Sequence, residues 1–361
     1  MTALLVILIL VVLIVVHEFG HFIAAKIFRI KVEEFGVGYP PRAFLIATFG
    51  GTEYTINWIP FGGFVRLFGE DETARGKGSF VDAPRWKQAI ILVAGVSANT
   101  VLAWLLFASS YTLGIPVAID TPEPGEKVQL FITDVVPGSP AAAANIAAGD
   151  EILNVTDKDG VHPRTLTPDA VMDFIKVRGG KQIVVGYMHE HATSTAYIRP
   201  ANAVVPGAAG RPAMGIGLAL VATRSLSWPA ALHQSLYVTI DVFKQVAQGL
   251  WVLLKEIFAG TLNLNDVVGP IGLAKVVGEA AQNGFGNVLK LAGFISVNLA
   301  VINLLPIPAL DGGRLLLLLI EAVLRRDAPK LAVQVINTLG IALIILLMLA
   351  VTYHDIAKLI S

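Results

Sequence analysis

Four stretches of the chain are each long and apolar enough to cross a lipid bilayer, which takes about 20 residues in α-helical conformation. They cover approximately residues 4–28, 89–113, 291–324 and 331–353. Charged residues make up only 15% of the 361 residues, whereas soluble globular proteins carry roughly a quarter. The sequence therefore predicts a polytopic α-helical membrane protein with four transmembrane helices.

The distribution of basic residues predicts the orientation of these spans, because short cytoplasmic loops are enriched in lysine and arginine. Basic side chains lie between the first and second predicted spans, and again between the third and fourth, where they are Arg325, Arg326 and Lys330. We therefore expect both loops to lie in the cytoplasm. Both termini and residues 115–286 would then lie outside.

Composition excludes several classes of site and partner. Lysine plus arginine and aspartate plus glutamate both total 27, and no basic tract indicates a nucleic-acid partner. The chain has no cysteine, which excludes disulfides, thiolate metal ligands and a cysteine nucleophile.

The predicted outside segment contains a compact, more polar module. Residues 135–155 show the pattern of a turn, a short helix, a Gly-Asp turn and a strand, and a helical stretch (168–177) and another strand (182–187) follow. This order resembles a PDZ domain, in which a groove between a strand and a helix binds an extended peptide. The alternative is a small α+β insertion without peptide-binding activity.

These features give four predicted regions. The N-terminal membrane half covers residues 1–114, the PDZ-like domain 115–205, a juxtamembrane segment 206–290 and the C-terminal membrane half 291–361. Within the juxtamembrane segment, residues 230–258 have the pattern of an amphipathic helix that lies on the membrane surface. Residues 35–42 and 53–70 show the alternation that is typical of β-hairpins.

The first predicted span ends with two histidines and a glutamate in an otherwise apolar setting. His17, Glu18 and His21 form the pattern H-E-x-x-H, and residues four apart share one face of a helix. Both imidazoles can therefore bind one Zn²⁺, with Glu18 beside it to accept a proton from water. The alternative is a set of satisfied polar residues packed between helices. Ionisable groups within a span are costly, however, and indicate a functional site by default.

A catalytic zinc site needs a third protein ligand, and Asp311 is the candidate. It is the only acidic residue between Glu279 and Glu321 and lies in the third predicted span, next to Pro306 and Pro308. A helix broken at membrane depth is tolerated only where it is buried in protein or lines a wet cavity. The alternative is that the carboxylate caps the next helix, which is compatible with a metal role.

Together these motifs resemble the site-two protease family of intramembrane zinc metalloproteases. The closer resemblance is to the bacterial regulator-of-sigma-E protease branch with a PDZ insertion. It covers nearly the whole chain and includes G-P-I-G at 269–272 and N-x-x-P-x-P-x-L-D-G-G at 303–313. The resemblance implies that His17, His21 and Asp311 bind one Zn²⁺ per chain and that Glu18 is the general base.

The resemblance also implies how substrate is held. Asn303, Pro306 and Pro308 match a family stretch implicated in holding the substrate. The hairpin residues would form a membrane-associated β-loop on the cytoplasmic side, which pairs with an extended substrate. The alternative is a cytoplasmic hairpin without contact to substrate.

The predicted function is therefore a zinc metalloendopeptidase for regulated intramembrane proteolysis. Its substrate would be a single-pass membrane protein already trimmed by another protease, such as an anti-sigma factor or a remnant signal peptide. We expect a multi-pass protein of the bacterial inner membrane, with the active site toward the cytoplasm and the PDZ-like domain periplasmic or extracellular.

Two other functions are compatible with a membrane protein of this kind. A catalytically silent membrane scaffold or chaperone, binding peptides through the PDZ-like domain, would be expected to have lost Glu18 or a ligand. A zinc transporter would be expected to show internal repeats and ligands spread along a path. The sequence retains Glu18 and all three candidate ligands. It shows neither internal repeats nor ligands spread along a path.

Overall fold

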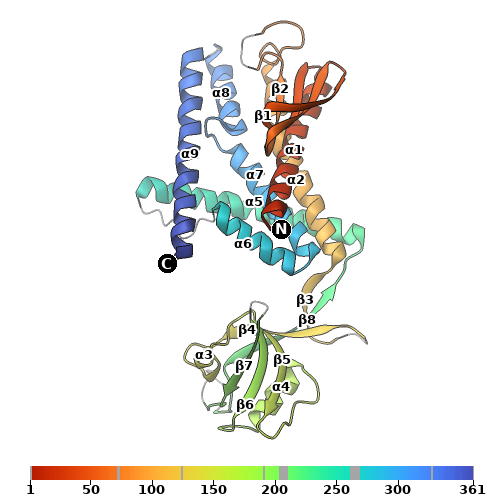
Figure 1. The fold of residues 1–361 in the computed structure, drawn as a ribbon, viewed down its shortest axis with the longest axis vertical. Coiled ribbons are helices and arrows are strands. Elements are labelled where there is room, and N and C mark those ends of the chain that lie inside the picture. The colour runs from red at the N-terminus through yellow and green to blue at the C-terminus, as the bar shows by residue number, and fades with distance from the viewer. Residues whose placement is uncertain are drawn as a thin grey trace. The chain divides into compact units, whose positions relative to one another are not determined.

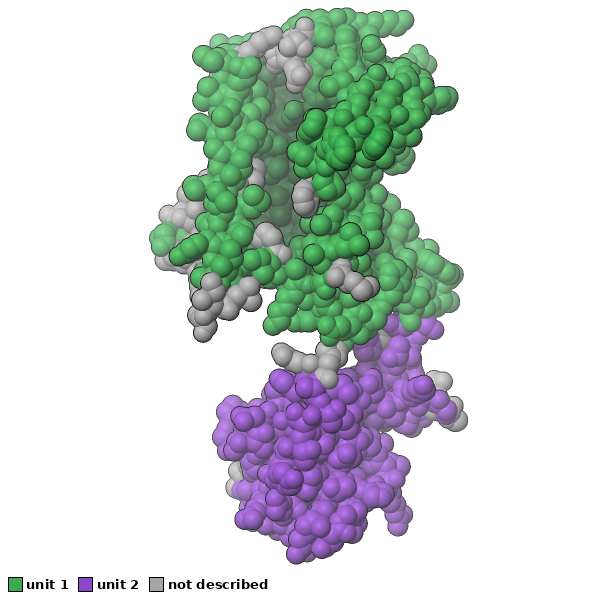
Figure 2. Space-filling view, viewed as in Figure 1, with its two compact units in different colours: residues 1–113, 226–361 green, residues 114–225 purple. Residues whose placement is uncertain are grey.

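The structure is a computed structural model that describes residues 2–70, 74–122, 125–189, 192–202, 210–260, 269–326 and 328–360. The chain folds into two compact units (Figure 2). Unit 1 consists of Met1–Leu113 and Leu226–Ser361, and unit 2 is Gly114–Ser225. The chain thus leaves the first unit once and returns to it.

Unit 1 is mainly helical (Figure 1). Its described helices are α1 (Thr2–Ile27), α2 (Arg85–Leu113), α5 (Trp228–Ala259), α6 (Pro270–Gln282), α7 (Phe285–Leu304), α8 (Asp311–Leu324) and α9 (Lys330–Ile360). Among the described residues, four helical segments are long and apolar enough to cross a membrane: Thr2–Ile27, Arg85–Leu113, Phe285–Leu304 and Val333–Ala357. The predicted number of candidate spans is therefore confirmed.

The third candidate span is shorter than the sequence suggested. Instead of one span over residues 291–324, α7 ends at Leu304 and α8 begins at Asp311. Pro306 and Pro308 lie in the intervening turn. They interrupt the helix, because proline has no backbone N–H to continue the helical hydrogen bonds and disfavours helical geometry at the residue before it. The broken helix predicted from these prolines is thus observed, but only α7 is long enough to cross a bilayer.

The helices that carry the site pack closely. α1 packs against α2, and α2 packs against α7. At the α1–α2 contact, Gly20 faces the backbone of Ala94, and a Cβ atom at Gly20 would also lie 2.8 Å from the Cβ of Ala98. Such small residues let two helix backbones approach each other, as is common between membrane helices.

A long, bent hairpin follows α1 and is formed by β1 (Val32–Phe49) and β2 (Thr52–Leu67). The start of β1 pairs on one side with residues 63–67 and on the other side with residues 53–56, and the end of β1 pairs with residues 52–57. The predicted segment 35–42 lies in this element, and so does 53–70 except for residues 68–70, which form a turn after β2. Among the residues whose side chains are described, Phe44, Phe49 and Trp58 expose large apolar surfaces.

Helix α5 has the two faces predicted for residues 230–258. Ala231, Ser235, Thr239 and Val246 are buried, whereas Leu236, Tyr237, Ile240 and Trp251 are exposed. The exposed apolar face is compatible with an interfacial helix. Its location at the membrane surface stays a prediction.

Unit 2 is built on a six-stranded antiparallel sheet with the order β3-β8-β4-β5-β6-β7. Its strands are β3 (Ile115–Ile119), β4 (Val128–Val135), β5 (Glu151–Asp157), β6 (Ile183–His189), β7 (Ala192–Ile198) and β8 (Ile216–Arg224). Two helices, α3 (Pro140–Ala143) and α4 (Pro168–Lys176), complete it. The compact unit extends beyond the predicted boundary at residue 205, because β8 pairs with both β3 and β4.

Local sequence explains the turns of unit 2. Ser139 is the N-cap of α3 and accepts a hydrogen bond from the Ala142 N–H, which satisfies one of the unpaired donors of the first helical turn. Asp150 closes the turn before β5 by accepting from the Ala147 N–H. The side chains of both residues are almost fully buried.

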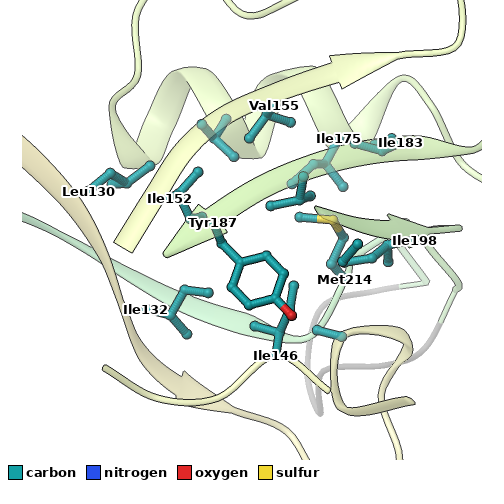
Figure 3. Packing of buried hydrophobic residues seen from close by; sticks show 14 of the residues in the cluster. Leu130, Ile132, Ile146, Ile152, Val155, Ile175, Ile183, Tyr187, Ile198 and Met214 are labelled. Atoms are coloured by element: carbon teal, nitrogen blue, oxygen red, sulfur yellow. The ribbon is translucent and has the colours of Figure 1, made fainter. Parts of the chain in front are cut away.

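The core of unit 2 lies between the sheet and α4. Figure 3 shows Leu130, Ile152, Ile175 and Ile198 directed into this core. All residues of this core belong to unit 2. Burial of each such aliphatic side chain contributes roughly 1.5–3 kcal/mol to the stability of the fold.

Candidate metal centre

The two predicted histidine ligands lie side by side on α1. His17 and His21 are one helical turn apart and are only 6% and 8% exposed. Their Nε2 atoms are 3.1 Å apart. The local helix therefore places two nitrogen donors at one point inside unit 1.

Asp311 joins them from the other end of the chain. Its Oδ2 atom lies 2.9 Å from Nε2 of His17 and 3.3 Å from Nε2 of His21. Leu310 is the N-cap residue of α8, so Asp311 occupies the first helical position. The side chain of Leu310 forms no capping hydrogen bond. Its carboxylate faces the histidines.

The turn between α7 and α8 fixes the position of Asp311. Gly312 and Gly313 lie against backbone carbonyl groups of this turn, and a Cβ atom at either glycine would collide with the carbonyl oxygen of Leu305 or Ile307. A side chain at these two positions would therefore push α8 away from the turn and move the carboxylate of Asp311.

The three donor atoms fit a zinc ion. Ligands at about 2.0–2.1 Å from a tetrahedral Zn²⁺ lie about 3.3 Å from one another, and the three separations in the structure are 2.9, 3.1 and 3.3 Å. Nitrogen and carboxylate donors are common zinc ligands. In the described part of the chain, His17, His21 and Asp311 are the one group of three or more potential metal ligands that meet in this way.

Helix α2 approaches the two histidines so closely at Gly95 that no side chain fits there. A Cβ atom at Gly95 of α2 would lie 2.7 Å from Nε2 of His17 and closer still to Nε2 of His21. Nδ1 of His21 lies 2.7 Å from the carbonyl oxygen of Ile91. Because a carbonyl oxygen can only accept, this nitrogen carries the proton, and the lone pair of Nε2 is directed toward the site.

Glu18 lines a cavity of about 200 Å³ together with His21 and Asp311. Segment 63–67 of β2 borders the same cavity with Gly63, Phe64, Val65 and Leu67. A Cβ atom at Gly63 would lie 3.7 Å from Cγ of Glu18, so the strand passes directly beside the carboxylate. The cavity thus combines two of the three proposed ligands, an acid–base group and a backbone strand.

The predicted substrate-binding residues are only partly brought together. Pro306 and Pro308 line a second cavity of about 490 Å³, which α8 and α9 also border. Asn303 is half-buried and lines neither of the two cavities. Glu70 and Arg314 line both cavities and form an ion pair.

Sequence reasoning missed four residues that border the site: Glu70, Gly95, Asn99 and Arg314. A usable signal existed for Asn99, which is fully buried, because a polar residue within an apolar span indicates a functional role. Glu70 and Arg314 are separated by 244 positions, so no local pattern could have paired them.

Two buried histidines one helical turn apart, a nearby carboxylate and an adjacent glutamate are the set of side chains expected of a metallopeptidase centre. Comparison with protein families agrees: the family described as "Peptidase family M50" matches residues 5–347. The chain therefore belongs to peptidase family M50, the site-two protease family.

Curated relatives match along nearly their whole length. A protein of Clostridium perfringens is 34% identical over 345 residues, which cover 95% of each chain. A protein of Nostoc is 32% identical and covers 96% of this chain and 93% of its own. A protein of Clostridium acetobutylicum is 30% identical, with 96% and 94% covered. Each carries the name "Putative zinc metalloprotease", so this chain belongs to a family of zinc metalloproteases.

Two solved structures resemble a quarter of the chain. The PDZ domain of an SdrC-like protein from Listeria innocua is 23% identical with a TM-score of 0.21, and the match covers 25% of this chain and 92% of that one. The second domain of a Listeria protein is 24% identical with a TM-score of 0.21, and covers 25% and 82%. The assignment of residues 115–205 as a PDZ-like domain stays a prediction.

The close contact between Gly95 and the two histidines gives a first test of the site. In Gly95→Ala the added methyl group displaces the His17 and His21 rings, and misplacement of catalytic groups by about 1 Å lowers rates about 100-fold. We therefore expect peptide cleavage to fall about 100-fold and zinc content to decrease.

The matched control is Gly249→Ala in α5, where an added Cβ atom would have no neighbour within 4 Å. This variant should cleave like the wild type. Equal activity of Gly95→Ala and the wild type would show that the close approach of α2 to the histidines is unimportant.

Proposed function

We propose that the chain is an intramembrane zinc metalloprotease that hydrolyses peptide bonds in or near the transmembrane segments of single-pass membrane proteins. The meeting of His17, His21 and Asp311 beside Glu18 carries this proposal. Membership in family M50 supports it. The four candidate spans are compatible with a site that works within a bilayer.

The residues of the site have distinct parts in hydrolysis. His17, His21 and Asp311 would hold the zinc ion, which when bound polarises a carbonyl group and makes water a stronger acid. Glu18 lies about 100° further around the helix axis than His17, so its carboxylate is free of the ligand triangle. It would accept the proton of the attacking water and pass it to the leaving amine.

Segment 63–67 is where we propose that substrate binds. It pairs with β1 on one side only, and within the described residues no further strand belongs to this sheet. A free strand edge can accept an extended peptide by backbone hydrogen bonding. A transmembrane helix must unwind before its peptide bonds are accessible, and pairing beside Glu18 would hold it unwound.

The expected setting follows from the orientation of the spans. With the basic loops in the cytoplasm of a bacterium, the site would open toward the cytoplasmic side of the inner membrane. Substrates trimmed by another protease, such as anti-sigma factors or remnant signal peptides, fit this position. No observation favours the alternative of a silent scaffold, because Glu18 and all three proposed ligands are present together.

Zinc-dependent cleavage is the direct test. The purified protein, reconstituted in liposomes, should cleave a single-pass substrate with a short outside segment. Incubation with a chelator should abolish cleavage, and added Zn²⁺ should restore it. Cleavage that continues at the same rate in protein shown to be metal-free would contradict the proposal.

Unit 2 should not be needed for chemistry, because the proposed catalytic residues all belong to unit 1. Pairing of β3 with β8 places Ile119 opposite Leu220, so residues 120–219 can be replaced by an Asn-Gly turn that closes a two-stranded hairpin. We expect the shortened protein to cleave a pre-trimmed substrate within about threefold of the wild-type rate. Lost cleavage with zinc retained would make unit 2 part of the catalytic machinery.

A further inference from the structure

His17 contacts polar groups through both of its ring nitrogens. Nε2 faces Asp311 and His21, and Nδ1 lies 3.5 Å from Nδ2 of Asn99 on α2. Asn99 is completely buried. The ring of His17 is therefore held between the proposed metal position and a single buried amide.

A histidine that binds metal through Nε2 must carry its proton on Nδ1. His21 meets this condition by donating from Nδ1 to the Ile91 carbonyl oxygen. His17 needs an acceptor at the equivalent position. With Nδ2 of Asn99 toward it, however, Nδ1 of His17 faces a group that can only donate.

The other end of the same amide has the opposite problem. Oδ1 of Asn99 is buried and has no hydrogen-bond partner, and a buried acceptor without a partner is destabilising. Rotation of the amide by half a turn exchanges Oδ1 and Nδ2. The oxygen then accepts from Nδ1–H of His17, so that Oδ1 of Asn99 and Nδ1 of His17 each gain a suitable partner.

The backbone holds Asn99 in place for this contact. Oγ of Ser296, on α7, donates to the carbonyl oxygen of Asn99 at 2.8 Å. Gly95, one helical turn earlier on α2, lies beside the same histidines. Helix α2 thus approaches both imidazoles through Ile91, Gly95 and Asn99.

We propose that Asn99 is a positioning residue that accepts a hydrogen bond from Nδ1–H of His17 through Oδ1, and so fixes the ring with Nε2 toward the metal. This rests on the proposed function, since it assumes that His17 is a zinc ligand. Outer hydrogen-bond partners of metal-binding histidines typically contribute 10–100-fold to metal affinity. Asn99 would then accept the Nδ1 proton of His17, just as the Ile91 carbonyl group accepts that of His21.

Three variants of the full chain test the proposal by zinc affinity, measured by competition with a chelator. Asn99→Leu has a similar size and no acceptor, and should bind zinc about 10–100-fold more weakly. Asn99→Asp keeps two acceptors and cannot donate, and should bind at least as tightly as the wild type, since carboxylate–histidine–zinc arrangements are common. Ser296→Ala removes a hydrogen bond to the Asn99 backbone without touching His17, and should leave the affinity within about threefold.

The outcomes separate the possible roles. A loss in Asn99→Leu that Asn99→Asp restores supports the acceptor role. Equal losses in both variants would mean that the amide donates. Unchanged affinity in Asn99→Leu would mean that Asn99 only fills space, and would also overturn the proposal. If Asn99→Leu does not fold, Asn99→Asp decides alone, because it lacks the donor. A wild-type protein that binds no zinc would overturn the proposed function itself, which is a distinct result.

Discussion

Glu18→Gln should abolish most turnover while the zinc ion stays bound. The amide has the size of the carboxylate and can still form hydrogen bonds, but it cannot accept a proton from water at neutral pH. Loss of a general base typically lowers a rate 10²–10⁴-fold. We expect a loss of this size in single-turnover cleavage, with unchanged zinc content and with uncleaved substrate retained on the protein as a stable complex.

Glu279→Gln is a suitable control for this variant, because Glu279 lies on α6 of the same unit and pairs with Lys275 at the surface. It removes one carboxylate charge and should cleave like the wild type. If Glu18→Gln also cleaves at the wild-type rate, the proton is accepted elsewhere and Glu18 is not the base. Loss of zinc in Glu18→Gln would instead make Glu18 part of the metal site.

The α1 half of the site could be predicted because it depends on local geometry alone. His17 and His21 are four residues apart in an apolar segment long enough to cross a bilayer as a helix, and a helix places such residues on one face. The same is true of the break before Asp311, since Pro306 and Pro308 impose it within a few residues. Here the sequence and the structure agree closely.

Contacts between distant segments could not be predicted in this way. Ile91 and Asn99 face His21 and His17 only because α2 packs against α1 through Gly20. The sequence shows that α2 is apolar, but not how far it is rotated about its axis. That rotation is set by side-chain packing along the whole helix, which no short pattern records.

The limits of unit 2 illustrate the same difficulty. Residues 182–187 are recognisable as a strand from their composition. The sequence of β8, in contrast, resembles the start of the apolar C-terminal region. It belongs to unit 2 because β4 and β3 both pair with it. Strand pairing over about 90 positions is a property of the fold and not of the local sequence.

Asp311→Ala should remove zinc from the protein, because it deletes the one ligand that α8 supplies. His17 and His21 would remain as a pair of donors, and the loss in affinity should exceed the 10–100-fold that an outer hydrogen-bond partner contributes. Elemental analysis should find about one zinc per wild-type chain and little in the variant after dialysis against a weak chelator. Glu321→Ala, on the same helix α8 but bonded to the Ala328 N–H, should keep its zinc. Full retention of zinc in Asp311→Ala, together with its loss in His17→Ala, would remove Asp311 from the ligand set and leave the third ligand to another residue.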